Sequence, residues 1–562
     1  MIPRISRLAA AFLCLLVLIV PSKVRAAEVG TCDSCQRLFR ETPGMVIREI
    51  RITQRDVFDP SEGLPGWFPW QTVNRLHLRT AEQVIRDELL LREGDRLDPD
   101  LIQESRRNLR ALDYFRDERI DCDRIDDRGV RVSISLREVW SLIPVFDIQE
   151  VEGSRIVTAG LTEQNLLGLG KVLSASYRKG AQSRNLFVED SWRVRYLDPN
   201  VLGSRVQMAW TVQDLETGES TRASLERPFY SLETPWAAGA SMNHARFRRR
   251  LIQNGRIVAD YDREDNAGML HFGAALRPGP PVVHRLEATY NYVQRRIRDF
   301  RPLSGEDPPP ERPQDDTLSY PGIAWRRLGV NYIVERRIAQ FERHEDFNLG
   351  NDLSLAAGFS ADALGAARDE WIFSASDSQG YAFRPGHFAL ARAVAFGRLA
   401  GDTWRNTEGF FHYDHYLRDT PLDAGPLLHT FHLEGEFGYG VNLDPDRLLA
   451  LGWDTGLRGY DADAFTGNKL LRVSLEDRIF ASRRLLGLVA LGLLLFWDSG
   501  YVWDVGQSID LDQIRNDAGV GLRIALPQLS GTSVAHLTWG VPVGRGGGLR
   551  DGIVTFSTET GF

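Results

Sequence analysis

An arginine flanked by glycines in the last third of the chain has the surroundings that most suggest chemistry. The segment Gly456-Leu457-Arg458-Gly459-Tyr460 places a guanidinium in a stretch where Gly459 lets the backbone turn tightly or approach another strand. A carboxylate holds the planar fork of a guanidinium through two charge-assisted hydrogen bonds, which fixes the direction of a loop as a lysine does not. Such an arginine can fix a loop to a carboxylate, but an Arg-Gly-Tyr triplet is common, so the pattern alone is a weak signal.

Enzyme motifs give only weak signals. Residues 168–171 (Gly-Leu-Gly-Lys) end like a phosphate-binding loop, but Val172 replaces the required Ser or Thr and no helix follows. His412 and His415 resemble metal ligands, yet residues three apart on a strand point to opposite faces, which disfavours a shared ion. No Ser-His-Asp arrangement is signalled, and chance pairs among 76 acidic residues decide nothing. We expect no enzymatic activity, no cofactor and no metal.

The N-terminus has the composition of a secretory signal. Arg4 and Arg7 precede the apolar run Leu8–Val20, and Val24-Arg25-Ala26 forms a small-residue cleavage site. The run is too short for a spanning helix, which needs about 20 residues. We therefore predict a signal peptide over residues 1–26 and an N-terminal extension over residues 27–43.

Composition narrows the class of the exported chain. With 68 basic and 76 acidic residues the net charge is −8, which argues against a nucleic-acid partner. Abundant charge disfavours a helical membrane protein, whereas a transmembrane β-barrel has unremarkable hydropathy because its strands alternate lipid-facing and lumen-facing residues. A barrel therefore remains allowed.

Three cysteines, Cys32, Cys35 and Cys122, remain after Cys14 leaves with the signal. An oxidising compartment favours one disulfide among the three and leaves one thiol over, with the pairing open. The two-residue gap between Cys32 and Cys35 suggests a redox centre or half of a zinc site, but no second pair follows. A structural or incidental role is the favoured interpretation.

Residues 44–141 have the pattern of a small α+β module. Ile50 and Ile52 alternate with polar residues as in a half-buried strand, and the aromatic insertion 64–70 is expected to be a loop on its own module. A capping box at Thr80 predicts a first helix, with Gly94 as its stop, and Asp98 followed by a proline predicts a second. Two strands follow, over 114–120 and 130–136, so the order is strand, helix, helix, strand, strand.

From residue 142 to 562 a period of two replaces helical periodicity. Met208 and Trp210 share one face while Gln207 and Thr211 share the other, and the pattern recurs to the end. At about 26 residues per strand and connection, this predicts a transmembrane antiparallel barrel of about sixteen strands. A soluble sandwich or propeller is disfavoured by aromatics near strand ends, by the export signal and by the terminal Phe562.

Three segments of this region carry particular expectations. Residues 485–497 are expected to form a strand packed on both faces, and residues 301–321 an external loop. The first barrel strand, expected within residues 155–168, should close against the last, residues 553–562. Phe556 and Phe562 would then belong to a terminal β-signal at that seam.

The order of motifs resembles the BamA/TamA superfamily of outer-membrane assembly factors. The 44–141 module resembles a POTRA domain, Arg458-Gly459-Tyr460 is similar to the family's inward-loop motif, and residues 496–500 match its Phe-x-Asp-x-Gly motif. The resemblance implies that Asp498 on the barrel wall, next to Gly500, holds Arg458, with Glu476 as a second acceptor. Weaker matches stand in family order at residues 165–171, 196–199, 227–230 and 519–523, followed by Pro527. A single such module is visible, whereas BamA-type members carry several.

The resemblance also implies location, partners and activity. It places the barrel in the outer membrane of a Gram-negative-type bacterium and the small domain in the periplasm. It implies contacts with lipid, with unfolded outer-membrane or secreted clients and possible accessory lipoproteins. The implied activity is insertion of proteins into the membrane, or movement of polypeptide across it, through a lateral seam. A passive pore or structural barrel is the alternative, and lipid handling between membranes is a third hypothesis that the sequence does not separate.

Overall fold

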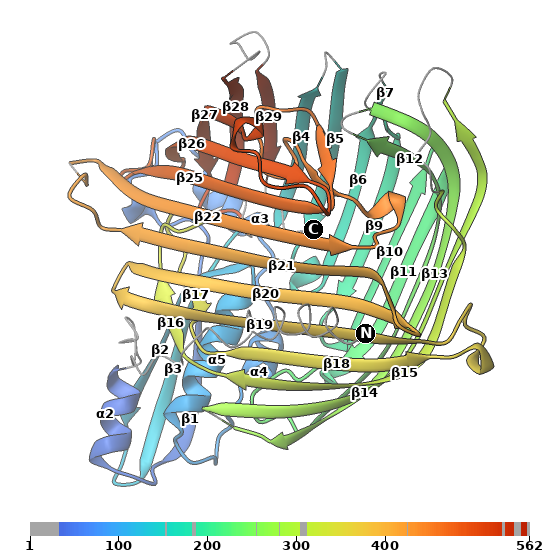
Figure 1. The fold of residues 1–562 in the computed structure, drawn as a ribbon. Helices are drawn as coiled ribbons and strands as arrows, with labels where there is room; N and C mark the ends of the chain where they lie inside the picture. Colours follow the sequence, from blue (N-terminus) through green and yellow to red (C-terminus); the bar gives the residue numbers. More distant parts are fainter. Residues whose placement is uncertain are drawn as a thin grey trace.

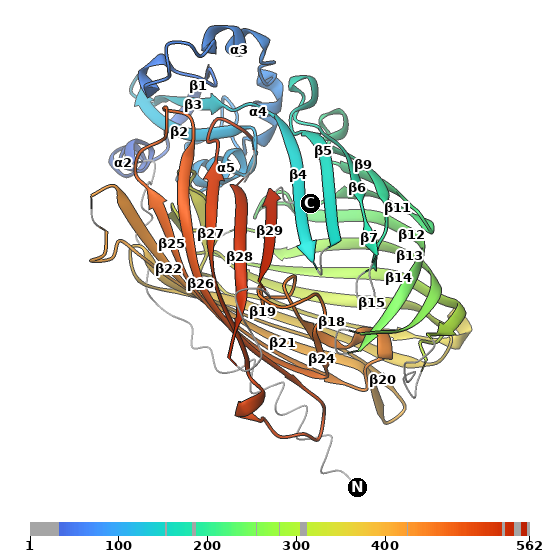
Figure 2. The same cartoon turned by 90° about the horizontal axis from the view of Figure 1, so that it is seen from above.

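A small N-terminal domain sits at one end of a closed barrel (Figures 1 and 2). The computed structural model describes residues 33–151, 154–182, 187–253, 256–279, 281–303, 312–423, 425–530, 534–544 and 552–558. Within these ranges, no helix has both the length and the apolar character needed to cross a membrane. The predicted signal peptide and Phe562 lie outside the described residues.

The N-terminal domain is a three-stranded sheet covered by helices. Strand β3 lies in the middle of the sheet, parallel to β1 and antiparallel to β2. The predicted order of strand, helix, helix, strand and strand is present, with two helices, α2 and α3, that were not predicted. The elements are α2 (Asp33–Glu41), β1 (Val46–Arg55), the 3-10 turn η1 (Pro60–Glu62), α3 (Trp70–Leu76), α4 (Glu82–Glu88), α5 (Pro99–Ala111), β2 (Phe115–Arg124) and β3 (Gly129–Glu138).

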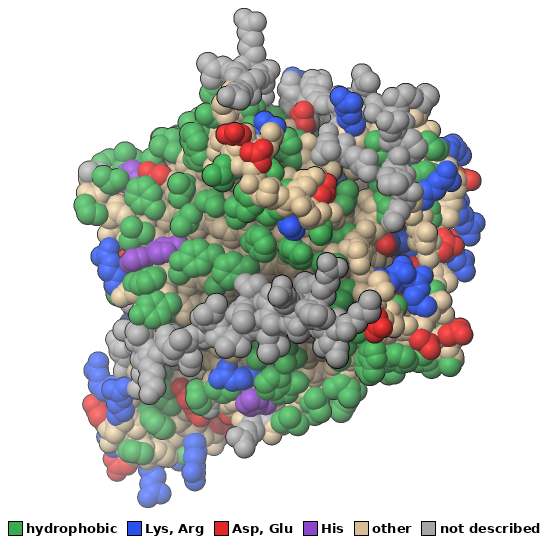
Figure 3. Space-filling model, in the orientation of Figure 1, with side chains coloured by type: hydrophobic (Ala, Val, Ile, Leu, Met, Phe, Trp, Pro, Cys, Tyr) green, Lys and Arg blue, Asp and Glu red, His purple; other side chains and the backbone are tan. Residues whose placement is uncertain are grey.

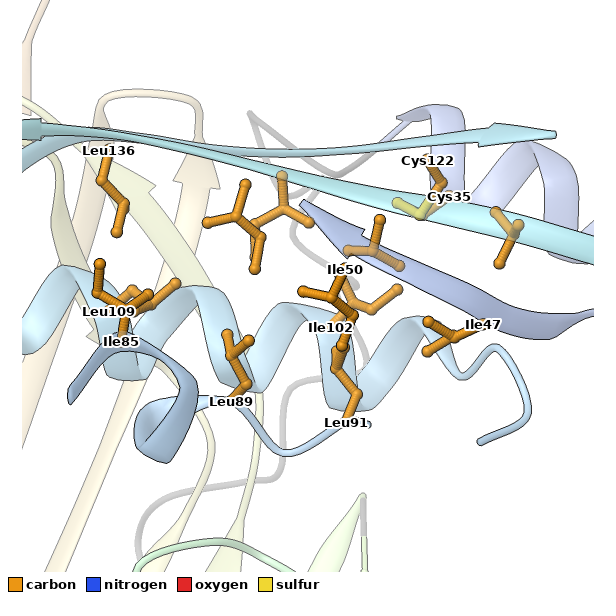
Figure 4. Close-up of a cluster of buried hydrophobic side chains, with 14 of the residues drawn as sticks. Cys35, Ile47, Ile50, Ile85, Leu89, Leu91, Ile102, Leu109, Cys122 and Leu136 are labelled. Carbon is orange, nitrogen blue, oxygen red and sulfur yellow. A yellow bond between two sulfur atoms is a disulfide. The ribbon is translucent and has the colours of Figure 1, made fainter. Parts of the chain in front are cut away.

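One apolar core holds this domain together (Figure 4). Ile85 of α4, Ile102 and Leu109 of α5 and Leu136 of β3 are all fully buried, because the helical and strand periodicities point them at the same layer. A disulfide between Cys35 and Cys122 attaches α2 to β2 beside that core, which answers the pairing that the sequence left open. Cys32 lies outside the described residues.

Of the two predicted helix caps, one is confirmed and one is wrong. Asp98 Oδ1 accepts hydrogen bonds from the backbone N–H groups of Asp100 (2.8 Å) and Leu101 (3.4 Å) at the start of α5. Thr80 does not cap α4, because its hydroxyl donates instead to the fully buried carboxylate of Glu138, at 3.0 Å. Helix α4 also ends at Glu88, well before Gly94.

The rest of the described chain forms a closed barrel of twenty strands in which all neighbours are antiparallel. The estimate of about sixteen was wrong because several connections have only two residues, as at 216–217, 385–386 and 401–402. The strands are β4 (Leu142–Val151), β5 (Ser154–Glu163), β6 (Val172–Lys179), β9 (Ser191–Asp198), β10 (Gln207–Leu215), β11 (Gly218–Arg227), β12 (Trp236–Gln253), β13 (Arg256–Arg277), β14 (Val282–Pro302), β15 (Asp316–Gly329), β18 (Asp352–Ser360), β19 (Glu370–Arg384), β20 (His387–Ala400), β21 (Thr403–Arg418), β22 (Leu427–Val441), β25 (Lys469–Ala481), β26 (Ala490–Trp503), β27 (Arg515–Ala525), β28 (Val534–Val543) and β29 (Ile553–Thr558). A two-stranded piece, β7 (Ala181–Gln182) with β8 (Phe187–Val188), stands between β6 and β9.

Two segment expectations are corrected. The strand that closes against the last one is β4, which follows the N-terminal domain after three residues, and not a strand within 155–168. Pro144 lies inside β4, and a proline normally argues against a strand unless that strand is at an edge. Part of the expected external loop 301–321 is strand, since β15 begins at Asp316.

The outer face of the barrel is apolar over its middle. Figure 3 shows hydrophobic side chains across the visible face, with charged side chains on the N-terminal domain and along the opposite rim. Strand β26 has the predicted packing on both faces, although it begins at Ala490 rather than at residue 485. Leu493 and Leu495 are exposed on its outside, whereas Leu494 and Phe496 are buried on its inside. Asp498, two residues after Phe496 on the same inner face, is also buried, so this face carries both apolar and ionic side chains.

Candidate functional site: an inward loop tethered to the barrel wall

The connection between β22 and β25, residues 442–468, folds back into the barrel from the end opposite the N-terminal domain. Its short strands β23 (Leu449–Leu451) and β24 (Phe465–Gly467) pair with each other. Leu451 and Leu457 are fully buried in a cluster that includes Leu470 on the wall strand β25. Apolar burial therefore holds the inward loop in the lumen and places its tip, Arg458, against the wall.

Arg458 reaches both predicted carboxylates. Its Nε and Nη2 donate to the two oxygens of Asp498, each at 2.7 Å, which is the expected bidentate geometry. Its Nη1 donates to Glu476 Oε1 at 2.6 Å, and Nη2 also donates to Ser474 Oγ at 3.0 Å. The guanidinium carbon lies 3.7 Å from the ring centre of Phe496, which adds a cation–π contact. Two wall strands, β25 and β26, therefore hold one loop residue.

The wall carboxylate is itself held in position. Ser474 Oγ donates to Asp498 Oδ1 at 2.6 Å, and Asp498 is completely buried. Asp517 of β27, also completely buried, is the direct cross-strand neighbour of Asp498. Two adjacent buried acids are unfavourable unless a cation lies close by, so the Arg458 guanidinium is part of what makes this wall stable.

The glycines of both motifs allow close approach between loop and wall. A Cβ atom at Gly459 would lie 2.8 Å from Asp517 Cβ and 2.8 Å from the carbonyl carbon of Val541. A Cβ atom at Gly500 would lie 2.7 Å from Leu451 Cδ1 of the loop. Tyr460 completes the contact, since its hydroxyl donates to the backbone oxygen of Asn516 at 3.1 Å. The structure therefore brings all six residues of the two motifs together.

The barrel closes between its first and last strands (Figure 2). Among the described residues, β29 meets β4 at three residue pairs, compared with ten between β4 and β5 and six between β28 and β29. Phe556 pairs with Ile148 there, and its ring lies 6.0 Å from that of Phe146. The Thr558 hydroxyl also bonds the backbone of Phe146, donating to its oxygen (3.1 Å) and accepting from its N–H (3.2 Å).

A second inner segment was not predicted. The connection between β15 and β18, residues 330–351, forms a hairpin of β16 (Tyr332–Glu335) and β17 (Glu345–Asn348) that we call the domain-end loop. Its Phe341 is buried against Phe480 of β25, and its backbone accepts hydrogen bonds from Arg478 and Arg523. It therefore crosses from β15 to the opposite wall. The only sequence signal was a charged run without periodicity.

The domain-end loop also binds the N-terminal domain. Arg343 forms an ion pair with Asp113 at 3.0 Å and donates to the backbone oxygen of Leu112 at 3.0 Å, while Arg110 of α5 pairs with Asp346. The domain contacts further barrel turns through Ala81 to Gly168, Thr80 to Asn165, Asp87 to Asn200, Glu104 to Leu232, Arg116 to Pro527 and Trp140 to Gln528. Together these segments cover the near end of the barrel.

The weak enzyme and metal signals do not converge on a site. His412 contacts Asp414 at 3.1 Å, whereas His415 contacts His387 at 2.8 Å and stacks on Phe383. Lys171 pairs with Asp198 at 3.0 Å. Across the described ranges, no group of three or more His, Cys, Asp or Glu side chains is arranged to hold a metal ion.

One family model matches part of the N-terminal domain, and several solved structures are similar to most of the chain. Residues 76–138 match the POTRA family, described as "Surface antigen variable number repeat". No curated protein matches the sequence. Among solved structures, the chain is similar to CdiB from Acinetobacter baumannii, with 11% identity over 99% of this chain and 96% of that chain and a TM-score of 0.44. CdiB from Escherichia coli has 12% identity over 99% and 97%, with a TM-score of 0.42. BamA from Haemophilus ducreyi lacking POTRA domains 1-3 has 13% identity over 92% and 84%, with a TM-score of 0.39.

Because these TM-scores lie below 0.5, the three likenesses carry no argument by themselves. The POTRA match, the closed barrel that follows it and the tethered inward loop are observations independent of these likenesses. On these observations the chain resembles the BamA/TamA superfamily, with a POTRA-matching domain before a closed antiparallel barrel.

Proposed function

We propose that this protein inserts client proteins into the outer membrane, or moves polypeptide across it, by opening the seam between β4 and β29. The N-terminal domain would then lie in the periplasm and meet unfolded outer-membrane or secreted clients, with or without accessory lipoproteins. No step needs an enzymatic reaction or a cofactor, because the folding of the client supplies the free energy.

The short seam, with three residue pairs among the described residues, is the observation that carries the proposal. An unpaired backbone N–H or C=O in lipid costs several kcal/mol, so a continuous ladder holds two strands together strongly and a short one does so weakly. Opening the seam breaks few bonds and exposes two strand edges. A client strand that pairs with either edge regains those bonds, which makes its addition favourable.

The contacts inside the barrel favour a route for the client through the seam over a route through the lumen. The domain-end loop and the N-terminal domain cover one end of the barrel, and the inward loop enters from the other. A polypeptide crossing the lumen would have to displace buried side chains such as Phe341 and Leu457. Sideways opening at β4 and β29 leaves both sets of contacts in place.

A cross-strand disulfide tests the seam directly. Ile148→Cys with Phe556→Cys joins residues that are direct partners across β4 and β29. Oxidised protein should fail to restore outer-membrane protein levels in cells depleted of the native chain, and reduction should restore them. Leu522→Cys with Leu537→Cys, a directly paired and outward-facing position across β27 and β28, is the matched control and should remain active in both states. Equal activity of the oxidised seam variant would refute the proposal.

The alternative is a passive pore with the inner loops as plugs. Depletion separates the two functions. Loss of many outer-membrane proteins, or of one specific passenger, supports the insertase or translocator. Altered permeability with normal membrane composition supports the pore. Planar-bilayer conductance is a weaker companion test, because barrels of this family also conduct.

A further inference from the structure

Four arginines line the inside of the barrel close to the seam. Arg178 of β6, Arg193 and Arg195 of β9 and Arg222 of β11 form what we call the basic wall. The strand order from the seam is β29, β4, β5, β6, β9, β10 and β11, so the wall begins three strands from β29.

Cross-strand pairing shows that these side chains face inwards. Arg195 pairs with Thr211, Thr211 with Arg222, Arg222 with Asn243 and Asn243 with Ala267 of β13. Four residues before Ala267 on the same face, Arg263 contacts Asp446 of the inward loop at 3.0 Å. The neighbouring Trp192 and Trp210 are exposed on the opposite, outer face.

No carboxylate neutralises the basic wall within the described part of the chain. Arg193 donates to Gln213 Oε1 at 3.1 Å, Arg222 to Asn243 Oδ1 at 2.9 Å and Arg178 to Thr158 Oγ1 at 3.3 Å, all neutral acceptors. Other lumen arginines differ, because Arg398 pairs with Glu370 and Arg472 pairs with Glu434 and Glu436. The positive charge on this wall is therefore left for a ligand.

The charges border an open cavity of about 710 Å³ on the inside of β9 to β14. Arg193, Arg195 and Arg222 line it together with Thr211, Gln213, Ser220, Ser224, Ser241 and Asn243. Small hydroxyl and amide groups offer hydrogen bonds without a closed pocket shaped for one small molecule. A second lumen cavity, of about 870 Å³ beside the inward loop, also contains arginines but is lined by Glu434, Glu436, Glu476 and Asp498.

The spacing of the arginines fits an extended chain. Arg193 and Arg195 are two residues apart on one strand, which separates their side chains by about 7 Å, the distance between alternate side chains of an extended peptide. Arg222 lies two strands from Arg195, about 10 Å to the side. We propose that the basic wall binds acidic segments of a client polypeptide in extended conformation while the client is held at the neighbouring seam. This inference depends on the proposed function, which supplies the client.

Peptide binding to the purified full-length protein tests this assignment. Fluorescence anisotropy would compare labelled peptides of alternating Glu-Ser, Gln-Ser and Lys-Ser at low salt. We expect the Glu-Ser peptide alone to bind, and its affinity to fall as salt rises. Arg195→Gln with Arg222→Gln should weaken binding about tenfold, since it removes two partly exposed ion pairs. Arg195→Lys with Arg222→Lys retains the charges and should retain most of the binding.

Three results would overturn the basic wall as a peptide site. The first is equal binding of the three peptides, and the second is unchanged affinity of the glutamine variant for the Glu-Ser peptide. The third is displacement of the Glu-Ser peptide by inorganic pyrophosphate at matched charge concentration, because that result would indicate a site for small anions. Heat-modifiable migration in gel electrophoresis, which compares unheated with heated samples, checks that each variant is a folded barrel. Peptide binding is measured without any insertion step, so a negative binding result leaves the seam proposal standing. A negative result in the seam disulfide test likewise leaves the peptide-binding proposal standing.

Discussion

Removing the Arg458 guanidinium should destabilise the inward loop without unfolding the barrel. Arg458→Ala deletes the bidentate pair with Asp498 and the bond to Glu476, and it leaves a completely buried Asp498 beside a completely buried Asp517. Breaking a buried ion pair by removing one partner costs about 3–5 kcal/mol, because the remaining charge has no compensation. The twenty-strand ladder is untouched, so the loss should appear as release of the loop and impaired function.

A double-mutant cycle measures this contact. We expect Arg458→Ala and Asp498→Ala each to lower the free energy of unfolding in urea by several kcal/mol. The double variant should cost about 2–3 kcal/mol less than the sum of the singles, since residues in direct contact couple by up to that amount. Hydrogen exchange of residues 449–467 should rise in both singles, and complementation of a depleted strain should fall in both.

Arg398→Gln provides the control, because the Arg398 side chain is even less exposed than that of Arg458 (5% against 21%) and pairs with Glu370 and Asp316 between wall strands, away from the inward loop. It should reduce stability without releasing residues 449–467 or impairing complementation. Additive effects of the two single substitutions, to within about 0.5 kcal/mol, would refute the shared contact. Normal complementation by both would remove the tether from the mechanism.

Three further predictions concern the N-terminal domain and the domain-end loop. Arg343→Ala removes the ion pair with Asp113 and should raise hydrogen exchange in residues 332–348 while leaving the strands protected; unchanged exchange there would contradict the docking contact. Burial, reinforced by Arg336, lowers the pKa of His344 to about 4 from its ordinary 6.5. Protonation therefore favours the released loop, and docking should weaken by up to about 3 kcal/mol as the pH falls from 6.5 to 4. His344→Gln should remove the pH dependence of hydrogen exchange in residues 332–348 between pH 6.5 and 4. If this pH dependence is unaltered in the variant, His344 is not its cause. Cys35→Ser removes the disulfide to Cys122, which joins residues 87 apart in the sequence. The free energy of unfolding of the N-terminal domain should fall by about 2–5 kcal/mol relative to the native protein, with both proteins unfolded by denaturant without reductant. An unchanged unfolding midpoint would show that α2 docks without the disulfide.

Local signals in the sequence predicted local structure well. Asp98 caps α5 because its partners are two and three residues away, and the alternation in β26 follows from the pleat of one strand. The contact between Arg458 and Asp498 joins residues that are 40 apart in the sequence. Its prediction therefore depended on the order of the motifs and not on periodicity.

Long-range competition explains most of the errors. Thr80 has the sequence of a cap, but a buried carboxylate 58 residues later takes its hydroxyl. The domain-end loop depends on pairs such as Arg110 with Asp346, which are 236 residues apart and leave no periodic trace in either segment. The strand count failed for a different reason, because the length of a connection depends on turn geometry and not on hydrophobic pattern.

Pro144 lies inside the strand on which the proposed function depends. A proline removes a donor from a ladder and is normally tolerated only at an edge strand. Strand β4 is bonded by ten pairs to β5 and, in the described residues, by three to β29, which makes it close to an edge inside a closed barrel. A strand of this kind is hard to recognise from its sequence because its pairing is incomplete. Under the proposed function, the same incompleteness would let a client strand compete for it.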